Sequence, residues 1–337
     1  MKLLTFAANG HHVGGARLGL LLADGRTVMD LAAAHRVKFG ASADFFQDAL
    51  AFLDAGAQAF DAARTVAAFI EQERPAGTVW PLDAVSLLAP VPRPRSIRDC
   101  MAFERHVIQC MRAVARRRYP PLAAVDAWLQ RLCGRGILRP PKVWYERPVY
   151  YKGNPMSVVG HEADVQWPSY TRRLDYELEF GVFVGKQGRN IAEEDAGAYI
   201  AGYTVFNDFS ARDVQGQEMT AQLGPSKGKD FDTGNVLGPY LVTPDEIPDP
   251  YRLTMVARVN GEEWSRGNSR EMAWTFEELL AYISKDETLY PGEFIGSGAV
   301  GGGCGLELGR WLKPGDVVEL EVERLGILRN RIIRAHT

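Results

Sequence analysis

The sequence predicts an α+β protein in which a strand-rich body follows a small N-terminal α/β domain. Three observations support this prediction. Short apolar runs bounded by turn residues dominate the chain after residue 170, helical spacing is concentrated between 42 and 132, and no internal repeat is visible. Because strands do not alternate regularly with helices, we expect no doubly wound parallel sheet.

The composition is typical of a globular protein of one to three domains. The chain has 337 residues, and 39 Lys and Arg against 42 Asp and Glu give a net charge of -3. Such a balance provides no global attraction for nucleic acid or an anionic membrane, and we expect neither partner. The chain contains no uncharged apolar run of the roughly 18 residues that a membrane span needs, and its N-terminus does not resemble a signal peptide. Four cysteines without a Cys-x-x-Cys pair argue against a disulfide scaffold or a thiolate zinc site, so we expect a cytoplasmic protein.

The first 90 residues are predicted to form the small domain. We expect strands over 2–6 and 17–31, the latter divided by a hairpin turn at Asp24-Gly25. An Ala-rich stretch over 42–72 has loose helical spacing and predicts one or two helices. The alternating prolines between 90 and 94 cannot continue either structure and indicate an extended linker. The predicted domains are therefore 1–90 and 91–337.

A helical hairpin is predicted near the start of the second domain. Apolar side chains recur at helical spacing over 104–118 and 123–132, with Pro120-Pro121 between the two stretches and Gly134 after the second. We expect this insertion, over about 104–140, to cover a site as a lid. Ten Lys and Arg residues lie between 105 and 147. A solvated helix face or a cover for an anionic site is the preferred interpretation, and an RNA-binding surface is the alternative.

The body is predicted to be built mainly from strands. They are expected over 174–185, 201–207, 238–243, 252–260, 294–299 and 316–323. Asn260-Gly261 is a hairpin-turn signal. Helices are expected to start at Asn190 and Thr275, because each is followed by Glu three residues later, the spacing of a capping box.

Two glutamates in the first of these strands are candidates for a metal site. Glu177 and Glu179 share one face of the predicted strand, while the apolar residues that alternate with them along the strand occupy the other face. A wet outer face is the usual explanation for a lone Glu-x-Glu, because water weakens the repulsion. The metal interpretation gains from Asp208, which ends an apolar strand. His106 and Asp99, seven residues apart, can share one helix face, although a hydrogen-bonded structural histidine is the commoner case.

A glycine-rich stretch near the C-terminus matches a nucleotide-binding pattern only superficially. Residues 296–301 match Gly-x-Gly-x-x-Gly, but neither a long helix nor a further βαβ unit follows, so we exclude dinucleotide binding. The glycines that continue to 305 suit a backbone that passes close to a ligand or another strand.

Taken in order, these motifs resemble the fumarylacetoacetate hydrolase (fumarylacetoacetase) family. The motifs are Arg98-Asp99 with His106, Tyr176-Glu177-Leu178-Glu179, the run from Asn207 to Asp213, the run from Lys227 to Gly234, and the run from Gly298 to Gly303. The resemblance covers roughly residues 90 to 335. It implies a mixed β-sandwich or roll behind a variable N-terminal domain, and a homodimer.

The resemblance also implies a divalent cation and the residues that use it. The implied ligands are Asp99, Glu177, Glu179 and Asp208. These hard oxygen donors suit Mg2+, Mn2+ or Ca2+ better than zinc. Lys229 is the implied neighbouring cation, with Thr233 beside it. His106 resembles the general base, oriented by Glu307, and the implied substrate contacts are Tyr151, Arg212 and Gln215.

Two features depart from the family pattern. The hairpin is longer and more basic than the family's compact lid, and Ala299 stands where hydrolases of the family often have a substrate-binding Thr. The expected function is metal-dependent hydrolysis of a C–C bond in a small 1,3-diketo or acylpyruvate-type substrate, in aromatic or keto-acid catabolism. An isomerase or decarboxylase of a 2-oxo acid is the enzymatic alternative. A non-catalytic ligand or RNA binder is the alternative from another class.

Overall fold

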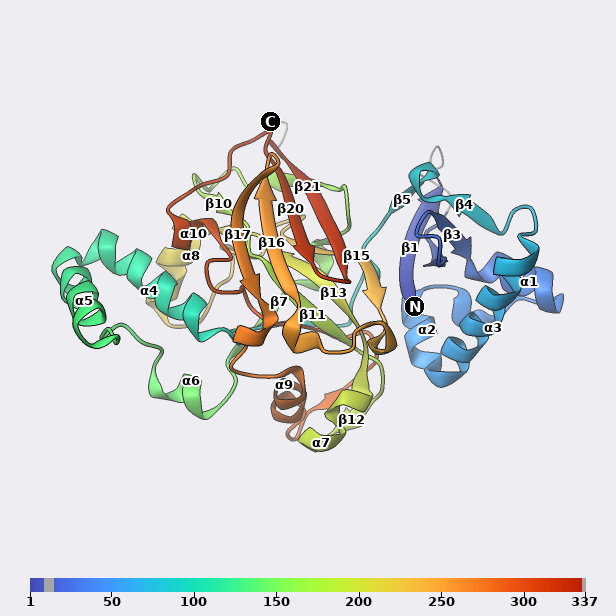
Figure 1. Ribbon diagram of the computed structural model, residues 1–337, viewed down its shortest axis with the longest axis horizontal. Coiled ribbons are helices and arrows are strands. Elements are labelled where there is room, and N and C mark those ends of the chain that lie inside the picture. The colour runs from blue at the N-terminus through green and yellow to red at the C-terminus, as the bar shows by residue number, and fades with distance from the viewer. Residues whose placement is uncertain (9–14, 335–337) are drawn as a thin grey trace.

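The computed structural model describes residues 1–8 and 15–334. Figure 1 shows a strand-rich body between an N-terminal unit of three helices and a helical hairpin that projects from the opposite end. The predicted α+β class is confirmed.

The largest sheet has 12 strands and runs through both the N-terminal unit and the body. Its main path is β4 (Val79–Pro81), β3 (Thr27–Asp30), β2 (Arg17–Leu21), β1 (Lys2–Ala8), β15 (Asn235–Val242), β13 (Ile200–Asp208), β11 (Glu179–Val184), β19 (Phe294–Gly296), β6 (Ile97–Cys100) and β7 (Tyr150–Gly153). Two short strands complete it, since β5 (Val85–Leu87) pairs with β1 and β8 (Val158–Val159) pairs with β15. Most neighbours are antiparallel, whereas β6 is parallel to β19 and β8 is parallel to β15.

A second sheet packs on one face of the first. Its order is β17 (Glu262–Asn268), β16 (Thr254–Val259), β20 (Val317–Val322), β21 (Gly326–Arg334) and β9 (Asp164–Trp167). Val182 and Val205 of the large sheet share one apolar core with Met255 and Leu320 of the small sheet. This face-to-face packing is the predicted β-sandwich.

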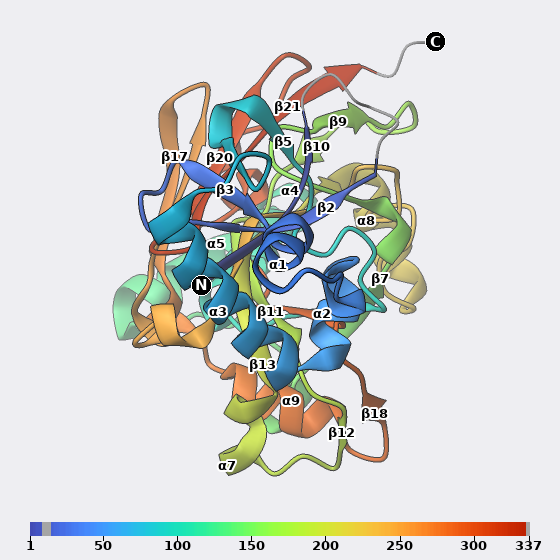
Figure 2. The same cartoon turned by 90° about the vertical axis from the view of Figure 1, so that its right-hand side faces the viewer.

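The N-terminal helices cover the other face of the large sheet, as the side view in Figure 2 shows. They are α1 (Leu31–Phe39), α2 (Ala49–Ala55) and α3 (Ala57–Glu73). Phe183 and Phe206, whose side chains point away from the small sheet, share a core with Phe52 and Val66 of these helices. The sequence missed α1, which begins after an Asp30 N-cap and buries only Leu31 and Ala34, so its apolar pattern is weak.

The two predicted domains are joined by more than the linker. Leu3 of β1 pairs with Leu241 of β15, and the Thr5 hydroxyl donates to the Pro90 carbonyl at 2.8 Å. The strand pairing places the N-terminal strand directly against the body. The boundary near residue 90 stays a prediction.

The predicted helical hairpin is confirmed as α4 (Glu104–Arg118) and α5 (Pro120–Cys133). Pro120 begins α5 instead of separating the two helices, because a proline in the first turn lacks only an N–H that would have no helical partner. Gly134 ends the helix with φ 70°, in the left-handed region. Trp128 and Leu132 of α5 are exposed, so its apolar positions do not form a core.

Three local predictions have different outcomes. The capping box of Thr275 and Glu278 is present at the start of α9 (Phe276–Ile283), and Asn260-Gly261 turns between β16 and β17 with φ 52° and 81°. The helix start at Asn190 is wrong. Its side chain accepts a hydrogen bond from Asp286 N at 2.7 Å, and the short α7 (Glu193–Ala196) begins after Ala192.

The remaining elements are short. They are α6 (Lys142–Glu146), α8 (Arg212–Glu218), α10 (Gly305–Leu308), the ribbon of β10 (Leu174–Asp175) with β14 (Ser210–Ala211), and the ribbon of β12 (Gly188–Arg189) with β18 (Thr288–Leu289). Within the described part of the chain, none of the helices has the length and apolar character needed to cross a membrane.

Candidate metal and catalytic centre

Three carboxylates converge where strands of the large sheet end. Asp99 belongs to β6, Glu179 begins β11 and Asp208 ends β13. One oxygen atom from each lies within 4.8 Å of the other two, and all three residues are buried. Gly296 of β19 makes room for the group, because a Cβ there would lie 2.5 Å from Asp99 Oδ1.

This group fits a hard divalent cation. Glu179 Oε2 and Asp208 Oδ1 are buried and, among the described residues, have no hydrogen-bond partner. Burial, together with the Asp208 carboxylate, raises the pKa of Asp99 to about 8, and burial and Asp99 hold the pKa of Glu179 well above its usual range. Buried oxygen donors that repel one another are stabilised by a dication such as Mg2+ or Mn2+.

Glu177 lies beside this group and is paired with protein cations. Lys229 Nζ contacts carboxylate oxygens of both Glu177 and Asp208, and Arg212 Nη2 donates to Glu177 Oε1 at 2.8 Å. Burial alone raises the pKa of Glu177, but Arg212 and Lys229 outweigh it and hold the pKa below its usual range. Of the four ligands expected from the resemblance, the structure brings three together and places Glu177 against two cations. The ligand role of Glu177 stays a prediction.

Glu177 also connects the carboxylates to the expected general base. His106 Nε2 lies 3.6 Å from Glu177 Oε1, while His106 Nδ1 lies 2.7 Å from Glu307 Oε1. Glu307 Oε2 accepts a hydrogen bond from Gly302 N at 2.8 Å, which fixes the carboxylate. Burial alone lowers the pKa of His106, but its hydrogen bonds to Cys304 and Glu307 outweigh this effect and raise it well above the usual value. The juxtaposition of His106 and Glu307 agrees with the resemblance.

The expected substrate contacts lie around the same centre. Tyr151 on β7 donates to Asp208 Oδ2 at 2.6 Å, and Arg212 Nη1 donates to Gln215 Oε1 at 3.0 Å. Ala299 is buried in the irregular segment after β19, next to Gly298, whose N–H donates to Asp99 Oδ1 at 3.1 Å.

Thr233 was expected beside Lys229. Its hydroxyl oxygen accepts a hydrogen bond from Gln166 N at 2.9 Å, so this hydroxyl holds β9.

Asp175 is a site residue that the sequence analysis missed. It is fully buried, accepts from Arg212 Nε at 2.8 Å, and accepts from the N–H groups of Gly305 and Leu306 at 2.7 and 2.9 Å. It therefore anchors both Arg212 and the segment that carries Glu307. The available signal was its position two residues before Glu177, which continues the alternation of carboxylates.

The predicted strand over 174–185 is interrupted, and its acidic face is dry. Strand β10 ends at Asp175, Glu177 makes an isolated bridge with Cys304, and β11 begins at Glu179. Glu177 and Glu179 are 5% and 1% exposed. The wet-face explanation is therefore wrong, because residues distant in the sequence cover this face.

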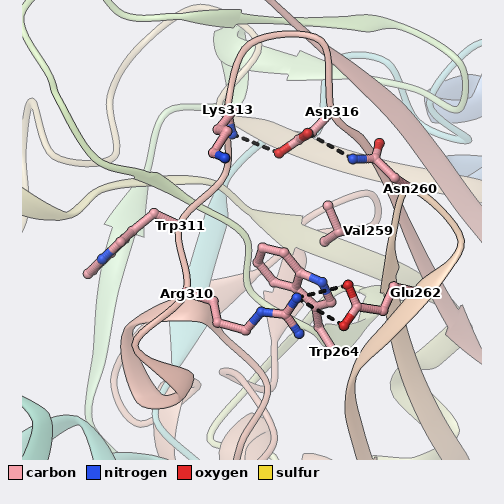
Figure 3. Close-up of a pocket in the computed structure, with 8 residues that line it drawn as sticks. All are labelled: Val259, Asn260, Glu262, Trp264, Arg310, Trp311, Lys313 and Asp316. Atoms are coloured by element: carbon pink, nitrogen blue, oxygen red, sulfur yellow. Dashed lines mark hydrogen bonds and ion pairs between the residues drawn. The ribbon is translucent and has the colours of Figure 1, made fainter.

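A surface hollow elsewhere on the body is lined by polar residues that bond to one another (Figure 3). It is lined by Val259, Asn260, Glu262, Trp264, Arg310, Trp311, Lys313 and Asp316. The Arg310 guanidinium stacks 4.0 Å from the centre of the Trp264 ring and donates to Glu262 at 2.9 and 3.0 Å. Asp316 accepts from Asn260 Nδ2 at 2.9 Å. None of the expected site residues lines this hollow.

Solved structures with this architecture include two named hydrolases. A fumarylacetoacetate hydrolase from Exiguobacterium antarcticum superposes with a TM-score of 0.71 at 24% identity, covering 99% of this chain and 100% of the other. Maleylpyruvate hydrolase from Sphingobium sp. SYK-6, solved with manganese(II) and pyruvate, gives 0.69 at 22% identity with both chains fully covered. At these identities the likeness concerns the fold.

Sequence comparison gives the family. Human mitochondrial oxaloacetate tautomerase FAHD2A is 32% identical over 334 residues, which are 99% of this chain and 92% of that protein. The model of the fumarylacetoacetate (FAA) hydrolase C-terminal family matches residues 127–333. The match begins after Asp99 and His106, so it does not include these two residues. The chain belongs to the fumarylacetoacetate hydrolase family, in which the human relative is named an oxaloacetate tautomerase.

Proposed function

We propose that this protein is a divalent-metal-dependent enzyme that interconverts the keto and enol forms of a small 2-oxo diacid such as oxaloacetate. The observation that carries the proposal is the His106–Glu307 pair, 2.7 Å apart, which Glu177 connects to the buried group of Asp99, Glu179 and Asp208. The oxaloacetate tautomerase activity for which the human relative is named supports the substrate class. Of the two enzymatic candidates, we therefore prefer an isomerase to a hydrolase.

Asp99, Glu179 and Asp208 would hold the cation. When bound there, a divalent cation supplies Lewis-acid polarisation of the oxygens of a 2-oxo acid. Lys229 lies between Glu177 and Asp208, so its charge offsets the excess negative charge of the carboxylates. Mg2+ and Mn2+ are the proposed ions, and Ca2+ also suits the donors.

His106 moves the proton. With its Nδ1–H donated to Glu307, the neutral imidazole has its free lone pair at Nε2. Nε2 takes a proton from the carbon beside the 2-oxo group and returns it to the oxygen of that group, which gives the enol. In the reverse direction, the neutral imidazole takes the proton from the enol oxygen and returns it to the carbon, which gives the keto form.

C–C bond hydrolysis of a 1,3-diketo or acylpyruvate-type substrate is the second candidate. The same His106–Glu307 pair is compatible with it, because an oriented imidazole can take a proton from water as well as from carbon. Hydrolysis adds water and gives two products, whereas tautomerisation leaves the carbon skeleton intact. The homodimer, the cytoplasmic location and a role in aromatic catabolism stay predictions.

A substrate panel separates the candidates. Purified protein with Mg2+ or Mn2+ is given enol-form oxaloacetate, other 2-oxo acids and acylpyruvates, and enol absorbance is followed while products are identified by NMR. We expect faster loss of oxaloacetate enol with no new carbon skeleton, and no acceleration with His106→Ala. Two products from an acylpyruvate and no effect on oxaloacetate would establish the hydrolase instead. Steeply salt-dependent RNA binding without turnover of any substrate would favour the non-catalytic alternative.

A further inference from the structure

A second group of possible metal ligands includes His106, the proposed base. His106 and Cys110 are four residues apart on α4 and therefore share one face of that helix. Cys304 and Glu307 meet them from the glycine-rich segment and α10. One donor atom from each of the four residues lies within 4.8 Å of all the others.

The contacts within this group are close. Cys110 Sγ lies 3.7 Å from His106 Nε2 and 3.8 Å from Nδ1, and Cys304 Sγ lies 3.4 Å from Glu307 Oε1. Cys304 is fully buried, while the other three residues are partly buried and belong to the face where the hairpin meets the body. Four ligands at zinc's bond lengths lie about 3.3 to 3.8 Å from one another in a tetrahedron. The separations from Cys110 Sγ to the imidazole and from Cys304 Sγ to Glu307 are of this size, whereas His106 Nδ1 and Glu307 Oε1, now 2.7 Å apart, must separate slightly to ligate one ion.

The chemistry of this group differs from that of the carboxylates. Two sulfurs, one imidazole nitrogen and one carboxylate oxygen form a set that suits Zn2+ and other soft or borderline divalent ions. The group of Asp99, Glu179 and Asp208 offers oxygen alone, which suits Mg2+ or Mn2+. The cysteine spacing in the sequence gave no sign of this group. Its donors come from two segments that are far apart in the chain, so no short motif contains them.

We propose that His106, Cys110, Cys304 and Glu307 form a second cation site that binds Zn2+, and that zinc there stops turnover. Binding requires both thiols to lose their protons to solvent. Ligation through His106 Nδ1 replaces the hydrogen bond to Glu307 and leaves the imidazole proton on Nε2. The nitrogen that should accept the substrate proton is then blocked. This inhibitory effect rests on the proposed role of His106, whereas binding of zinc does not.

Cobalt substitution tests the site without relying on activity. Full-length protein is kept reduced with a phosphine, saturated with Mg2+ and titrated with Co2+. We expect thiolate-to-cobalt charge-transfer absorption that saturates at one equivalent and disappears when Zn2+ is added. Cys110→Ser should lose at least tenfold in affinity together with this absorption. Cys133→Ser is the matched control, because Cys133 is exposed on α5 of the same hairpin and should leave the absorption unchanged.

Turnover then tests the inhibition. Each protein's rate with Mg2+ alone is the reference for its own inhibition, and Zn2+ should inhibit wild type and Cys133→Ser at least tenfold more strongly than Cys110→Ser. Absence of the charge-transfer absorption in wild type would overturn the site. Equal zinc inhibition of all three proteins would place the inhibitory zinc on the carboxylates and overturn the regulatory role. Cobalt absorption with zinc-insensitive turnover would leave the site standing and overturn the base role of His106.

Discussion

His106 Nδ1 lies 2.7 Å from Glu307 Oε1, although 201 positions separate the two residues in the chain. One residue belongs to the first turn of the projecting hairpin, and the other to a four-residue helix that Asp175 anchors through two N–H groups. The pair therefore forms only when the hairpin packs on the body. Movement of this hairpin would separate the proposed base from its orienting acid.

Metal binding and proton transfer should separate by mutation. Glu179→Ala removes an oxygen donor and should lose both Mn2+ affinity and turnover. His106→Ala should keep Mn2+ affinity while turnover falls by about 10² to 10⁴, the usual contribution of a general acid or base. Glu307→Gln should lower turnover by less, because it misorients the imidazole without removing it. Calorimetric Mn2+ titration beside steady-state rates checks all three, and wild-type turnover by His106→Ala would refute the base role.

Metal removal should abolish activity reversibly. Without a dication held by Asp99, Glu179 and Asp208, nothing polarises the substrate. Exhaustive chelation followed by readdition of Mg2+, Mn2+ or Zn2+ tests this, with recovery expected for the first two only. Full turnover of protein shown to be metal-free by elemental analysis would contradict a metal-dependent mechanism.

Binding of Mn2+ should release protons near neutral pH. Asp99 has a pKa of about 8 in the metal-free protein, so it is largely protonated at about pH 7 and must ionise to bind the cation. Affinity should therefore rise with pH up to about 8. Calorimetry in buffers of different ionisation enthalpy measures the released protons. Asp99→Asn is the control, and an unchanged proton release in this variant would assign the protons to other groups.

The stability of the metal-free protein should fall as pH rises. The pKa of Asp99 increases from its ordinary 3.8 to about 8 on folding, and those of Glu179 and Asp208 shift in the same direction. Between about pH 4 and about pH 8 the folded state therefore binds more protons than the unfolded state, so the unfolding free energy decreases with pH. Urea unfolding in chelator across this range should show the decrease, and saturating Mg2+ should reduce it. A flat profile in chelator would be inconsistent with the buried, uncompensated carboxylates.

Replacing Lys229 should destabilise the protein strongly. This buried lysine contacts both Glu177 and Asp208, so Lys229→Met leaves two buried carboxylates without their shared cation. Loss of one partner of a buried ion pair costs about 3–5 kcal/mol. Urea unfolding at neutral pH measures the loss, and Lys227→Met provides an exposed control two residues away. Similar stabilities of the two variants would show that Lys229 is not needed to offset the carboxylates.

Ala299→Thr should change substrate preference. A threonine hydroxyl at this buried position could donate to a substrate carboxylate, and such a bond is worth roughly 1.5 to 3 kcal/mol. We expect kcat/KM for acylpyruvate-type acids to rise about tenfold to a hundredfold relative to the native substrate. Arg112 is not a free alternative donor, because it is bound to Asp126 at 2.7 Å and Gln130 at 2.9 Å. An unchanged ratio, with stability and metal content intact, would show that position 299 does not face the carboxylate.

The features that could be predicted from the sequence depend on local interactions. The Thr275 capping box, the Asn260-Gly261 turn and the helical hairpin each depend on residues a few positions apart, so a short window contains the physical cause. The ordered motifs indicated the family, because each motif is itself a short stretch of sequence. Where a local pattern failed, as at Asn190, a contact from Asp286 across a ribbon replaced the expected cap.

Tertiary structure decided everything that depends on long-range packing. A strand's alternation gives Glu177 and Glu179 the same face, but only the segments that cover this face make it dry and bring Lys229 and Arg212 to Glu177. Sheet order brings Asp99, Glu179 and Asp208 together, and packing of the hairpin brings Cys110 to Cys304. Pairing of distant segments depends on packing of the whole core. A short stretch of sequence therefore cannot show which buried charge will contact a residue of another segment.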